Sequence, residues 1–522
     1  MTNIPTFLRK PENTIAISLS FAFTALLWWL PQAGLALAVV TTLFTILLAG
    51  SRLVYSMTGY ELPEPTDPGD DFVSIHIATY SEPPDVVKKT LDSLAHLDHE
   101  NYEVIVLDNN TPDPALYEPV RSHCRQLGSR FRFYHFDDVK GAKAGALNIS
   151  LELSDPRTDA ILILDADYQA RPGILKKGLS YFTDSTVALV QFPQAYRNSR
   201  KDCGLTWEYK LFFDLYMKLA NRWNTVLSTG TAAFVKKEAL IKSGGWSGET
   251  LTEDAELGLR LHRHGYRGIY VPEVVAAGLM PTDLKSLKAQ RRRWVLGNAQ
   301  SLVGLMKEKQ MKLERRAMML LQLTAWANPL LISAVFFLVS GAFHVVTGSA
   351  LCLAIAGLSF VGMLGYLAAT MLLFVRVVTR EGGTLGTALK AYGVHLGMLG
   401  EGAVSWCELF VQSDKSFVRT DKFIHAPEKW AITLSAFSSL LLASLGLNLV
   451  WLGGSIPLAL GLGLASVWAL GVASLRWNLH RIREHTLALE SAAEQPVETQ
   501  FRRTAKVDSE VKVLEHPMSS RR

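Results

Sequence analysis

Apolar segments long enough to be membrane helices lie on both sides of a region of soluble composition in this 522-residue chain. Two precede that region and four follow it, at about 14–30, 34–49, 318–343, 350–375, 430–452 and 456–475. A helix needs roughly 20 apolar residues to cross a hydrocarbon core of about 30 Å. The sequence therefore predicts a polytopic membrane protein with six crossings and a soluble domain inserted between the second and the third.

Basic residues predict the orientation of these helices. Arg9 and Lys10 precede the first apolar run, and basic residues flank the stretch 385–411 on both sides. Because cytoplasmic loops are enriched in Lys and Arg, both termini and the soluble domain are expected in the cytoplasm. The stretch 385–411 contains charged side chains and is expected to lie in the membrane interface. A cleaved signal peptide ending near 36–38 is an alternative for the first run, but the apolar sequence continues past that point.

Charge and cysteine content argue against several other classes of protein. The net charge of +5 is small for this length and gives no nucleic-acid-binding signature. The four cysteines are scattered without CxxC spacing, which argues against a zinc site and against a disulfide framework. We therefore expect a reducing, cytosolic environment for the soluble region.

The soluble region, residues 63–283, alternates short β-rich runs with helical stretches after a Pro- and acid-rich linker at 63–69. Strands are expected at 73–78, 103–107 and 160–164, and helices at 84–97 and 114–127. This alternation is typical of a parallel sheet covered by helices on both faces, in which ligands bind at the carboxyl ends of the strands.

Polar side chains follow all three of these predicted strands. Asp165 and Asp167 come directly after 160–164, Asp108 follows 103–107, and Tyr80 and Glu82 follow 73–78. Two carboxylates separated by one residue can hold a hard divalent cation such as Mg²⁺ or Mn²⁺, which would neutralise a diphosphate. A solvated turn is the alternative for such a pair. The convergence of three strand ends favours a nucleotide site.

A third acidic motif is Thr252-Glu253-Asp254, which is typical of a helix start with Thr252 as the cap. One interpretation is that its acidic residues only cap the helix. The alternative is that Asp254 is a general base for an acceptor hydroxyl.

The motif QRRRW occupies residues 290–294 within a basic amphipathic stretch, 284–317, that is expected to lie in the membrane interface. Gln290, Arg293 and Trp294 share one face of that predicted helix. Trp294 could stack on a sugar ring, and Arg293 could stabilise a leaving diphosphate. A membrane-anchoring helix with an interfacial Trp is the alternative. Arg291 and Arg292, on other faces, are expected to contact lipid headgroups.

Together these motifs resemble the processive family 2 glycosyltransferases, whose members include bacterial cellulose synthase catalytic subunits and curdlan and mixed-linkage β-glucan synthases. The matching motifs are YSE at 80–82, Asp108, GAKAGALN at 141–148, DAD at 165–167, TED at 252–254 and QRRRW at 290–294. The resemblance covers roughly residues 15–475. It implies a GT-A domain inserted between transmembrane helices of the bacterial inner membrane.

The resemblance also implies roles for individual residues. Glu253 and Asp254 would be catalytic, with Asp254 as the base, and Asp165 and Asp167 would hold the metal. A loop at 412–428 contains FVRTDK at 417–422, which is similar to a gating loop that reads FxVTxK in cellulose synthases. The nucleotide sugar would contact Tyr80, Glu82, Asp108, Lys143, Asp165, Gln290, Arg293, Trp294, Phe417, Thr420 and Lys422, and the acceptor would contact Thr229, Gly230, Thr231 and Trp294.

Two segments depart from the cellulose synthase pattern. STGT at 228–231 stands where FFCGS is usual, and QFPQAY at 191–196 stands where QTPHHF is usual. The second difference looks more like glucan synthases that make β-1,3 or mixed linkages.

The resemblance implies an inverting synthase that polymerises glucose from UDP-glucose into a β-1,4, β-1,3 or mixed-linkage glucan and moves it across the membrane. Periplasmic or outer-membrane export proteins would be its partners. Alternatives are a synthase of an amino-sugar polymer (chitin, poly-N-acetylglucosamine or hyaluronan), a lipid glycosyltransferase, and a nucleotide-sensing transporter. Residues 1–62 and 318–476 would hold the membrane helices. The polar tail, 477–522, is expected to be a frayed helix and disorder.

Overall fold

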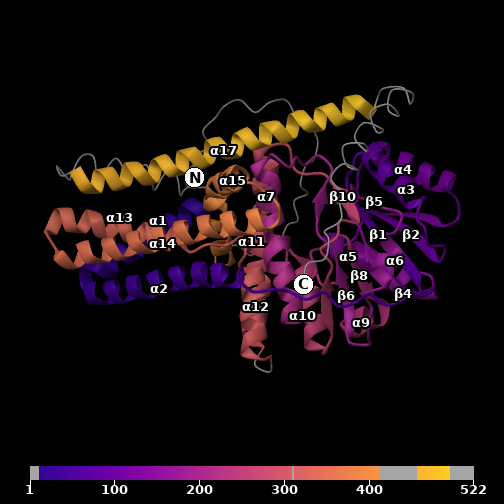
Figure 1. The fold of residues 1–522 in the computed structure, drawn as a ribbon, viewed down its shortest axis with the longest axis horizontal. Coiled ribbons are helices and arrows are strands. Elements are labelled where there is room, and N and C mark those ends of the chain that lie inside the picture. The colour runs from indigo at the N-terminus through magenta and orange to yellow at the C-terminus, as the bar shows by residue number, and fades with distance from the viewer. Residues whose placement is uncertain (1–10, 309–310, 411–454, 494–522) are drawn as a thin grey trace, which may run out of the picture.

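The computed structural model describes residues 11–308, 311–410 and 455–493, and it consists of a helical part beside a sheet-containing domain (Figure 1). The long helices that flank the domain in sequence pack together on one side of the molecule. They are α1 (Pro11–Trp29), α2 (Pro31–Tyr55), α13 (Leu330–Thr347) and α14 (Ala350–Arg380). The domain is thus an insertion between helices that meet in space.

The main sheet of the domain has seven strands in the order β3-β2-β1-β4-β8-β6-β9. β8 runs antiparallel to both of its neighbours, and the other pairings are parallel. The prediction of an all-parallel sheet is therefore wrong at β8. The strands are β1 (Phe72–Thr79), β2 (Tyr102–Asn109), β3 (Phe131–Phe136), β4 (Thr158–Ile163), β6 (Val187–Gln191), β8 (Ala233–Lys236) and β9 (Arg267–Tyr270).

A small second sheet lies at the edge of the domain, in the order β5-β10-β7. Its strands are β5 (Gln169–Ala170), β7 (Ala195–Tyr196) and β10 (Ala276–Gly278). β5 follows the Asp165–Asp167 motif directly, so this sheet fixes the chain on the far side of the motif.

Helices cover both faces of the main sheet, as the sequence predicts, because its strands are apolar on both sides. All eight residues of β2 are buried. One core contains residues of α3 (Pro84–Leu94), α4 (Pro114–Leu127) and α6 (Ile174–Leu179). The opposite core contains residues of α5 (Ala142–Leu153), α9 (Lys237–Lys242) and α10 (Glu253–Arg263).

Several helices connect the domain to the apolar part. They are α7 (Gly204–Leu211), the π-helical η1 (Phe212–Met217), α8 (Lys218–Arg222), α11 (Leu284–Lys307), α12 (Leu313–Leu323), α15 (Leu385–Val404) and the 3-10 segment η2 (Ser405–Phe410). In Figure 1, α11 and α12 stand at the boundary between the two parts. Asp283 caps α11 by accepting a hydrogen bond from the Ser286 backbone N–H at 2.8 Å.

Three of the described helices are long and apolar enough to cross a membrane, namely α2, α13 and α14, and Thr14–Trp29 within α1 is apolar but shorter. The predicted run 430–452 lies outside the described residues. The predicted run 456–475 forms the first half of α17 (Ser455–Ala493).

The predicted crossing at 318–343 is wrong as a single helix, because α12 ends at Leu323 and α13 begins only at Leu330. Pro329 explains the break, since proline disfavours helical geometry at the preceding residue and has no N–H to donate. Pro329 is the N-cap of the new helix, and the side-chain oxygen of Asn328 before it accepts a hydrogen bond from the Leu330 N–H at 3.2 Å.

The prediction of a frayed tail from Asn478 is wrong for residues 478–493, which continue α17 along the domain. Leu479, Ile482 and Thr486 are buried. Their spacing places them on one face of the helix, and the apolar side chains pack beside Cys203 and Met280. Residues 494–522 lie outside the described part of the chain.

Candidate active site

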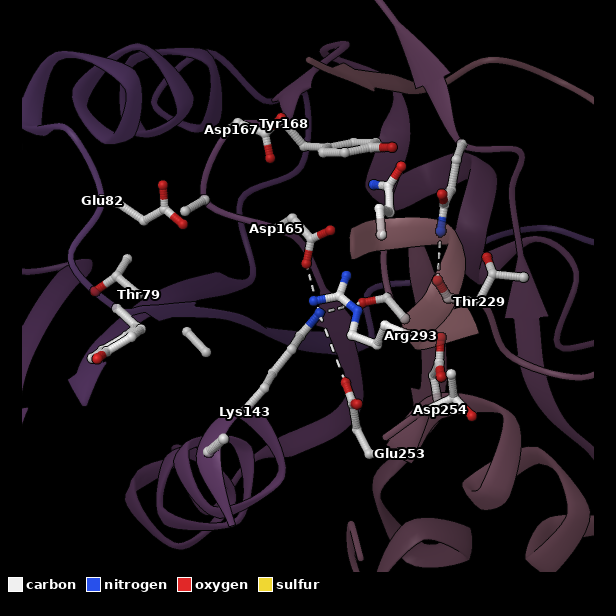
Figure 2. Close-up of a pocket in the computed structure, with 18 of the residues that line it drawn as sticks. Thr79, Glu82, Lys143, Asp165, Asp167, Tyr168, Thr229, Glu253, Asp254 and Arg293 are labelled. Atoms are coloured by element: carbon white, nitrogen blue, oxygen red, sulfur yellow. Dashed lines mark hydrogen bonds and ion pairs between the residues drawn. The ribbon is translucent and has the colours of Figure 1, made fainter. Parts of the chain in front are cut away.

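A cavity of about 350 Å³ opens at the carboxyl ends of β1, β2 and β4, where the sequence predicts a nucleotide site. Its walls come from the loops after these strands, the first turns of α5 and α10, and one face of α11 (Figure 2). The predicted site residues that line it are Tyr80, Glu82, Lys143, Asp165, Asp167, Thr229, Gly230, Glu253, Asp254, Gln290, Arg293 and Trp294.

Lys143 lies at the centre of the charged side chains of this cavity. Its Nζ donates to Asp165 Oδ1 at 2.6 Å and to the Gly230 carbonyl at 2.8 Å, and it lies 4.0 Å from Glu253 Oε1 (Figure 2). Burial opposes the charge of this ammonium group, but Asp165 and Glu253 outweigh burial and raise the pKa of Lys143. A fixed positive charge therefore faces the space where a diphosphate would fit.

Asp254 lies in the first turn of α10 and faces the cavity (Figure 2). Burial and the neighbouring Glu253 raise the pKa of Asp254 to about 7. That pKa suits a carboxylate that must accept a proton near neutral pH. Thr252 occupies the N-cap position as predicted, but its side chain makes no capping hydrogen bond.

Asp165 and Asp167 both reach the cavity wall and offer oxygen ligands for a divalent cation (Figure 2). Asp167 Oδ2 also accepts a hydrogen bond from the Leu279 N–H at 2.6 Å, which fixes this carboxylate. Among the described residues there is no group of three or more His, Cys, Asp or Glu side chains placed to hold a metal. Two carboxylates fit Mg²⁺ or Mn²⁺, because such ions commonly complete their coordination with water and substrate phosphates.

A second cavity, of about 60 Å³, shares five residues with the first, namely Gln194, Thr229, Thr252, Asp254 and Trp294. Its remaining lining is mainly apolar and aromatic, with residues from α7, η1 and α12. Trp294 faces Trp326 there, with 5.6 Å between the ring centroids. Flat aromatic surfaces are suited to stacking on sugar rings. Asp254 thus stands between a charged cavity and an aromatic one.

Two models of related glycosyltransferase families match overlapping parts of the chain. Glycosyl transferase family group 2 matches residues 160–375, and Glycosyl transferase family 2 matches residues 74–244. The cellulose synthase catalytic subunit [UDP-forming] of Xanthomonas axonopodis pv. citri is 30% identical over 270 residues, which is 49% of this chain and 36% of the relative. These matches support a family 2 glycosyltransferase of the cellulose synthase-like type.

A plant relative is similar over a comparable length. Glucomannan 4-beta-mannosyltransferase 1 of Oryza sativa subsp. japonica is 27% identical over 268 residues, covering 49% of this chain and 50% of the relative. The match thus spans no more than half the length of these two relatives. The resemblance to cellulose synthase-like family 2 glycosyltransferases is confirmed, and the domain has a GT-A-like fold with a mixed sheet.

Among solved structures, a mannosyltransferase from Pyrobaculum calidifontis in complex with GDP-Man and Mn²⁺ is 19% identical, with a TM-score of 0.46. The match covers 73% of this chain and 98% of that one.

Two predicted site residues lie behind the cavity wall. Asp108 is buried, and its Oδ2 accepts from the hydroxyls of Thr79 and Thr111, both at 2.8 Å. Thr231 is also buried, and its hydroxyl accepts from the Asp165 N–H at 3.0 Å. In this structure both residues fix groups that line the cavity. Phe417, Thr420 and Lys422 lie outside the described residues.

Some residues that line the first cavity were not predicted from the sequence, namely Thr79, Asn109, Asn110, Tyr168, Gln194, Tyr196 and Leu279. Gln194 donates from its Nε2 to the Thr229 carbonyl at 2.6 Å and accepts from the Tyr196 hydroxyl at 3.1 Å. The segment 191–196 departs from the cellulose synthase pattern, and that departure was the available signal for Gln194 and Tyr196. No sequence signal pointed to Leu279, because it reaches the cavity through the pairing of the preceding strand β10 with β7.

The prediction that Arg291 and Arg292 contact lipid headgroups is wrong. Arg291 is buried and pairs with Glu208 of α7, and Arg292 pairs with Glu408 of η2 through two hydrogen bonds of 2.7 and 2.5 Å. Glu208 and Glu408 thus take the positions that headgroups were expected to occupy, although the Arg292 side chain stays 43% exposed.

Proposed function

We propose that this family 2 glycosyltransferase is a membrane-embedded processive synthase. It would transfer glucose from UDP-glucose to a growing β-glucan and pass the polymer across the inner membrane. The observation that carries the proposal is the position of Asp254 on the wall that the charged and the aromatic cavity share. The names of the relatives, cellulose synthase and glucomannan 4-beta-mannosyltransferase, support a β-linked polysaccharide product.

The donor would bind in the first cavity with its diphosphate against the cations. Lys143 already lies among the carboxylates there, and Arg293 lines the same cavity. Both side chains can donate hydrogen bonds to phosphate oxygens, and Arg293 can do so with two parallel bonds. Mg²⁺ or Mn²⁺ held by Asp165 and Asp167 would neutralise part of the diphosphate charge.

The acceptor would lie in the second cavity with its terminal hydroxyl towards Asp254. Asp254 would take the hydroxyl proton while the oxygen attacks the anomeric carbon of the donor. The bond from that carbon to the diphosphate would break, and its electron pair would leave on UDP. A single displacement inverts the anomeric centre, so an α-linked donor sugar gives a β-linked product.

The aromatic cavity also supports passage of the polymer towards the membrane helices. Trp326 on its wall lies in the connection between α12 and α13, and α13 is long and apolar enough to cross a membrane. A chain extended at Asp254 would therefore move past Trp294 and Trp326 towards these helices. The same proposal includes six crossings, a cytoplasmic catalytic domain and accessory export proteins. It also includes a nucleotide-binding role for Phe417, Thr420 and Lys422.

A donor screen with linkage analysis tests the choice of sugar. Purified full-length protein in lipid nanodiscs would be given Mn²⁺ with UDP-glucose, UDP-N-acetylglucosamine or GDP-mannose, and nucleotide release and polymer would be measured. We expect turnover with UDP-glucose and a product that endo-β-glucanases degrade. Turnover with UDP-N-acetylglucosamine alone would overturn the donor assignment in favour of an amino-sugar polymer. Nucleotide binding without turnover of any donor would favour a sensor or transporter.

A further inference from the structure

Arg291 is a buried cation at the place where the catalytic domain meets the apolar helices. Its side chain is 3% exposed, and the side chain of its partner Glu208 is 0% exposed. The two form a bidentate pair, with Nη1 donating to Glu208 Oε1 at 2.9 Å and Nη2 donating to Oε2 at 2.7 Å. The pair joins α7 of the domain to the QRRRW helix α11.

The guanidinium of Arg291 also lies against the aromatic side chains of the second cavity. It lies over the Trp326 ring at 3.7 Å from the centroid, and 5.6 Å from the centroid of Trp294. Both indoles line that cavity. Because the negative face of an indole attracts a cation, one guanidinium bridges Trp294 on α11 and Trp326 before α13.

A parallel contact ties the neighbouring residues of the same two helices. Tyr209, which follows Glu208 on α7, donates a hydrogen bond from its hydroxyl to Gln290 Oε1. The Tyr209 ring packs edge-on to Trp294, with 5.6 Å between centroids. Two consecutive residues of α7 therefore hold two consecutive residues of α11, and Trp294 projects one turn further along that helix.

Glu208 and Arg291 do not themselves line either of the two cavities among the described residues. They act on the site only through the aromatic side chains. Such a pair is not explained by its contribution to the free energy of folding, because replacing a buried ion pair with apolar residues of similar volume is often neutral or stabilising. The planar fork of Arg, in contrast, fixes an orientation that an apolar side chain would leave free.

We propose that Glu208 and Arg291 are positioning residues that hold the indoles of Trp294 and Trp326 in one arrangement for the acceptor sugar. This inference rests on the proposed transfer of sugar to an acceptor at Asp254. It predicts that the pair affects elongation more than it affects use of the donor, because Trp294 lines both cavities but Trp326 lines only the second.

The decisive variant is Glu208→Leu/Arg291→Met, because it removes both charges of the pair together and leaves only His395, whose Nδ1 lies 3.8 Å from Glu208 Oε1. Full-length protein in nanodiscs would be given UDP-glucose and Mn²⁺. We would measure donor hydrolysis, as UDP released in the absence of acceptor, together with polymer elongation and the thermal unfolding midpoint. We expect elongation to fall on the order of 10²-fold, as for misplaced reactants. Donor KM should change less than about threefold, and the unfolding midpoint should stay near that of the wild type.

The matched control is Arg263→Met/Glu308→Leu, which removes an ion pair of 2.8 Å between the last turn of α10 and the C-terminal end of α11. It should elongate like the wild type. Arg291→Lys provides a second test if the double variant does not fold, because it keeps the charge and loses the fork. We expect it to fold and to elongate about tenfold more slowly.

Three outcomes would overturn the inference. A folded double variant that elongates at the wild-type rate would do so, as would an equal fall in donor hydrolysis and elongation. If the double variant does not fold, the inference would be overturned by an Arg291→Lys variant that elongates at the wild-type rate. These results differ from failure of the proposed function, in which the wild-type protein itself would release no nucleotide from any donor.

Discussion

The carboxylate of Asp254 lies against the backbone of Gly230, so closely that a Cβ atom at residue 230 would come within 2.6 Å of Asp254 Oδ2. Gly230 also has a φ of +82°, and its carbonyl accepts the hydrogen bond from Lys143 at 2.8 Å. Gly230 thus contacts two candidate functional groups. Its Cα lies against Asp254, the candidate base, and its carbonyl binds Lys143, the candidate phosphate-binding cation. Side chains other than hydrogen do not fit this place without displacing Asp254.

We predict that Gly230→Ala lowers sugar transfer on the order of 10²-fold, because the new methyl group moves the base. Gly265→Ala is the matched control. Gly265 has a φ of +83° and no atom within 4 Å of the added Cβ, so it carries the same backbone strain of about 1–2 kcal/mol without the contact. Steady-state UDP release from both variants, with unfolding midpoints, makes the comparison. Equal loss of transfer in the two variants would show that strain alone is responsible.

The raised pKa of Asp254 predicts the pH dependence of transfer. A base must be deprotonated, so the rate should rise with pH and reach half of its plateau near pH 7, where Asp254 titrates. Asp254→Asn should abolish transfer and remove this dependence. A pH–rate profile of kcat between pH 5 and 9 measures it, and a rate that falls as pH rises through 7 would contradict the role of base.

Glu253 raises the pKa of Asp254, so Glu253→Gln should move the midpoint of that profile to lower pH. The sign follows because removal of a neighbouring negative charge makes the Asp254 carboxylate easier to form. Glu256→Gln is the control, since Glu256 lies in the same helix turn and pairs with Arg260 at 2.8 Å. If both variants kept the wild-type midpoint, Glu253 would not be the group that raises the pKa of Asp254.

Removal of divalent cations should stop nucleotide release. We expect EDTA to abolish UDP release and Mn²⁺ or Mg²⁺ to restore it. Asp167→Asn should raise the Mn²⁺ concentration for half-maximal activity at least about tenfold, because a neutral amide is a weaker ligand than a carboxylate. Asp85→Asn, at a side chain that is 89% exposed on α3, should leave it unchanged. Full activity in EDTA would contradict metal binding by Asp165 and Asp167.

Trp294→Ala should abolish elongation, because it removes one of the two indoles of the aromatic cavity in which we propose that the acceptor binds. Product length by gel filtration and UDP release by a coupled assay would be compared with those of Trp477→Ala, whose side chain is 61% exposed. Retention of full polymer length by Trp294→Ala would exclude the stacking role.

Much of the site could be predicted from the sequence because its chemistry lies at strand ends and helix starts. Asp165, Asp167 and Lys143 all reach the cavity, and their positions depend only on where β4 ends and α5 begins. The helix face that carries Gln290, Arg293 and Trp294 was equally accessible, because side chains three and four residues apart lie together on a helix.

What the sequence did not reveal depends on contacts between segments far apart. Arg291 and Arg292 resemble membrane-anchoring residues until Glu208 and Glu408 are brought to them by α7 and η2. Asp108 ends its strand as predicted, but Thr79 and Thr111 occupy its Oδ2. The antiparallel β8 likewise follows from pairing with β4 and β6, and no local pattern in 233–236 indicates its direction.

The central claim is that one chain couples transfer at Asp254 to growth of a polymer. The most direct measurement is the ratio of UDP released to sugar incorporated into polymer, made on purified protein in nanodiscs with radiolabelled UDP-glucose and Mn²⁺. We predict one glucose in a β-glucanase-sensitive polymer for each UDP released, and neither product from Asp254→Asn. Release of UDP by the wild type without any polymer, or polymer formation by Asp254→Asn, would contradict the account.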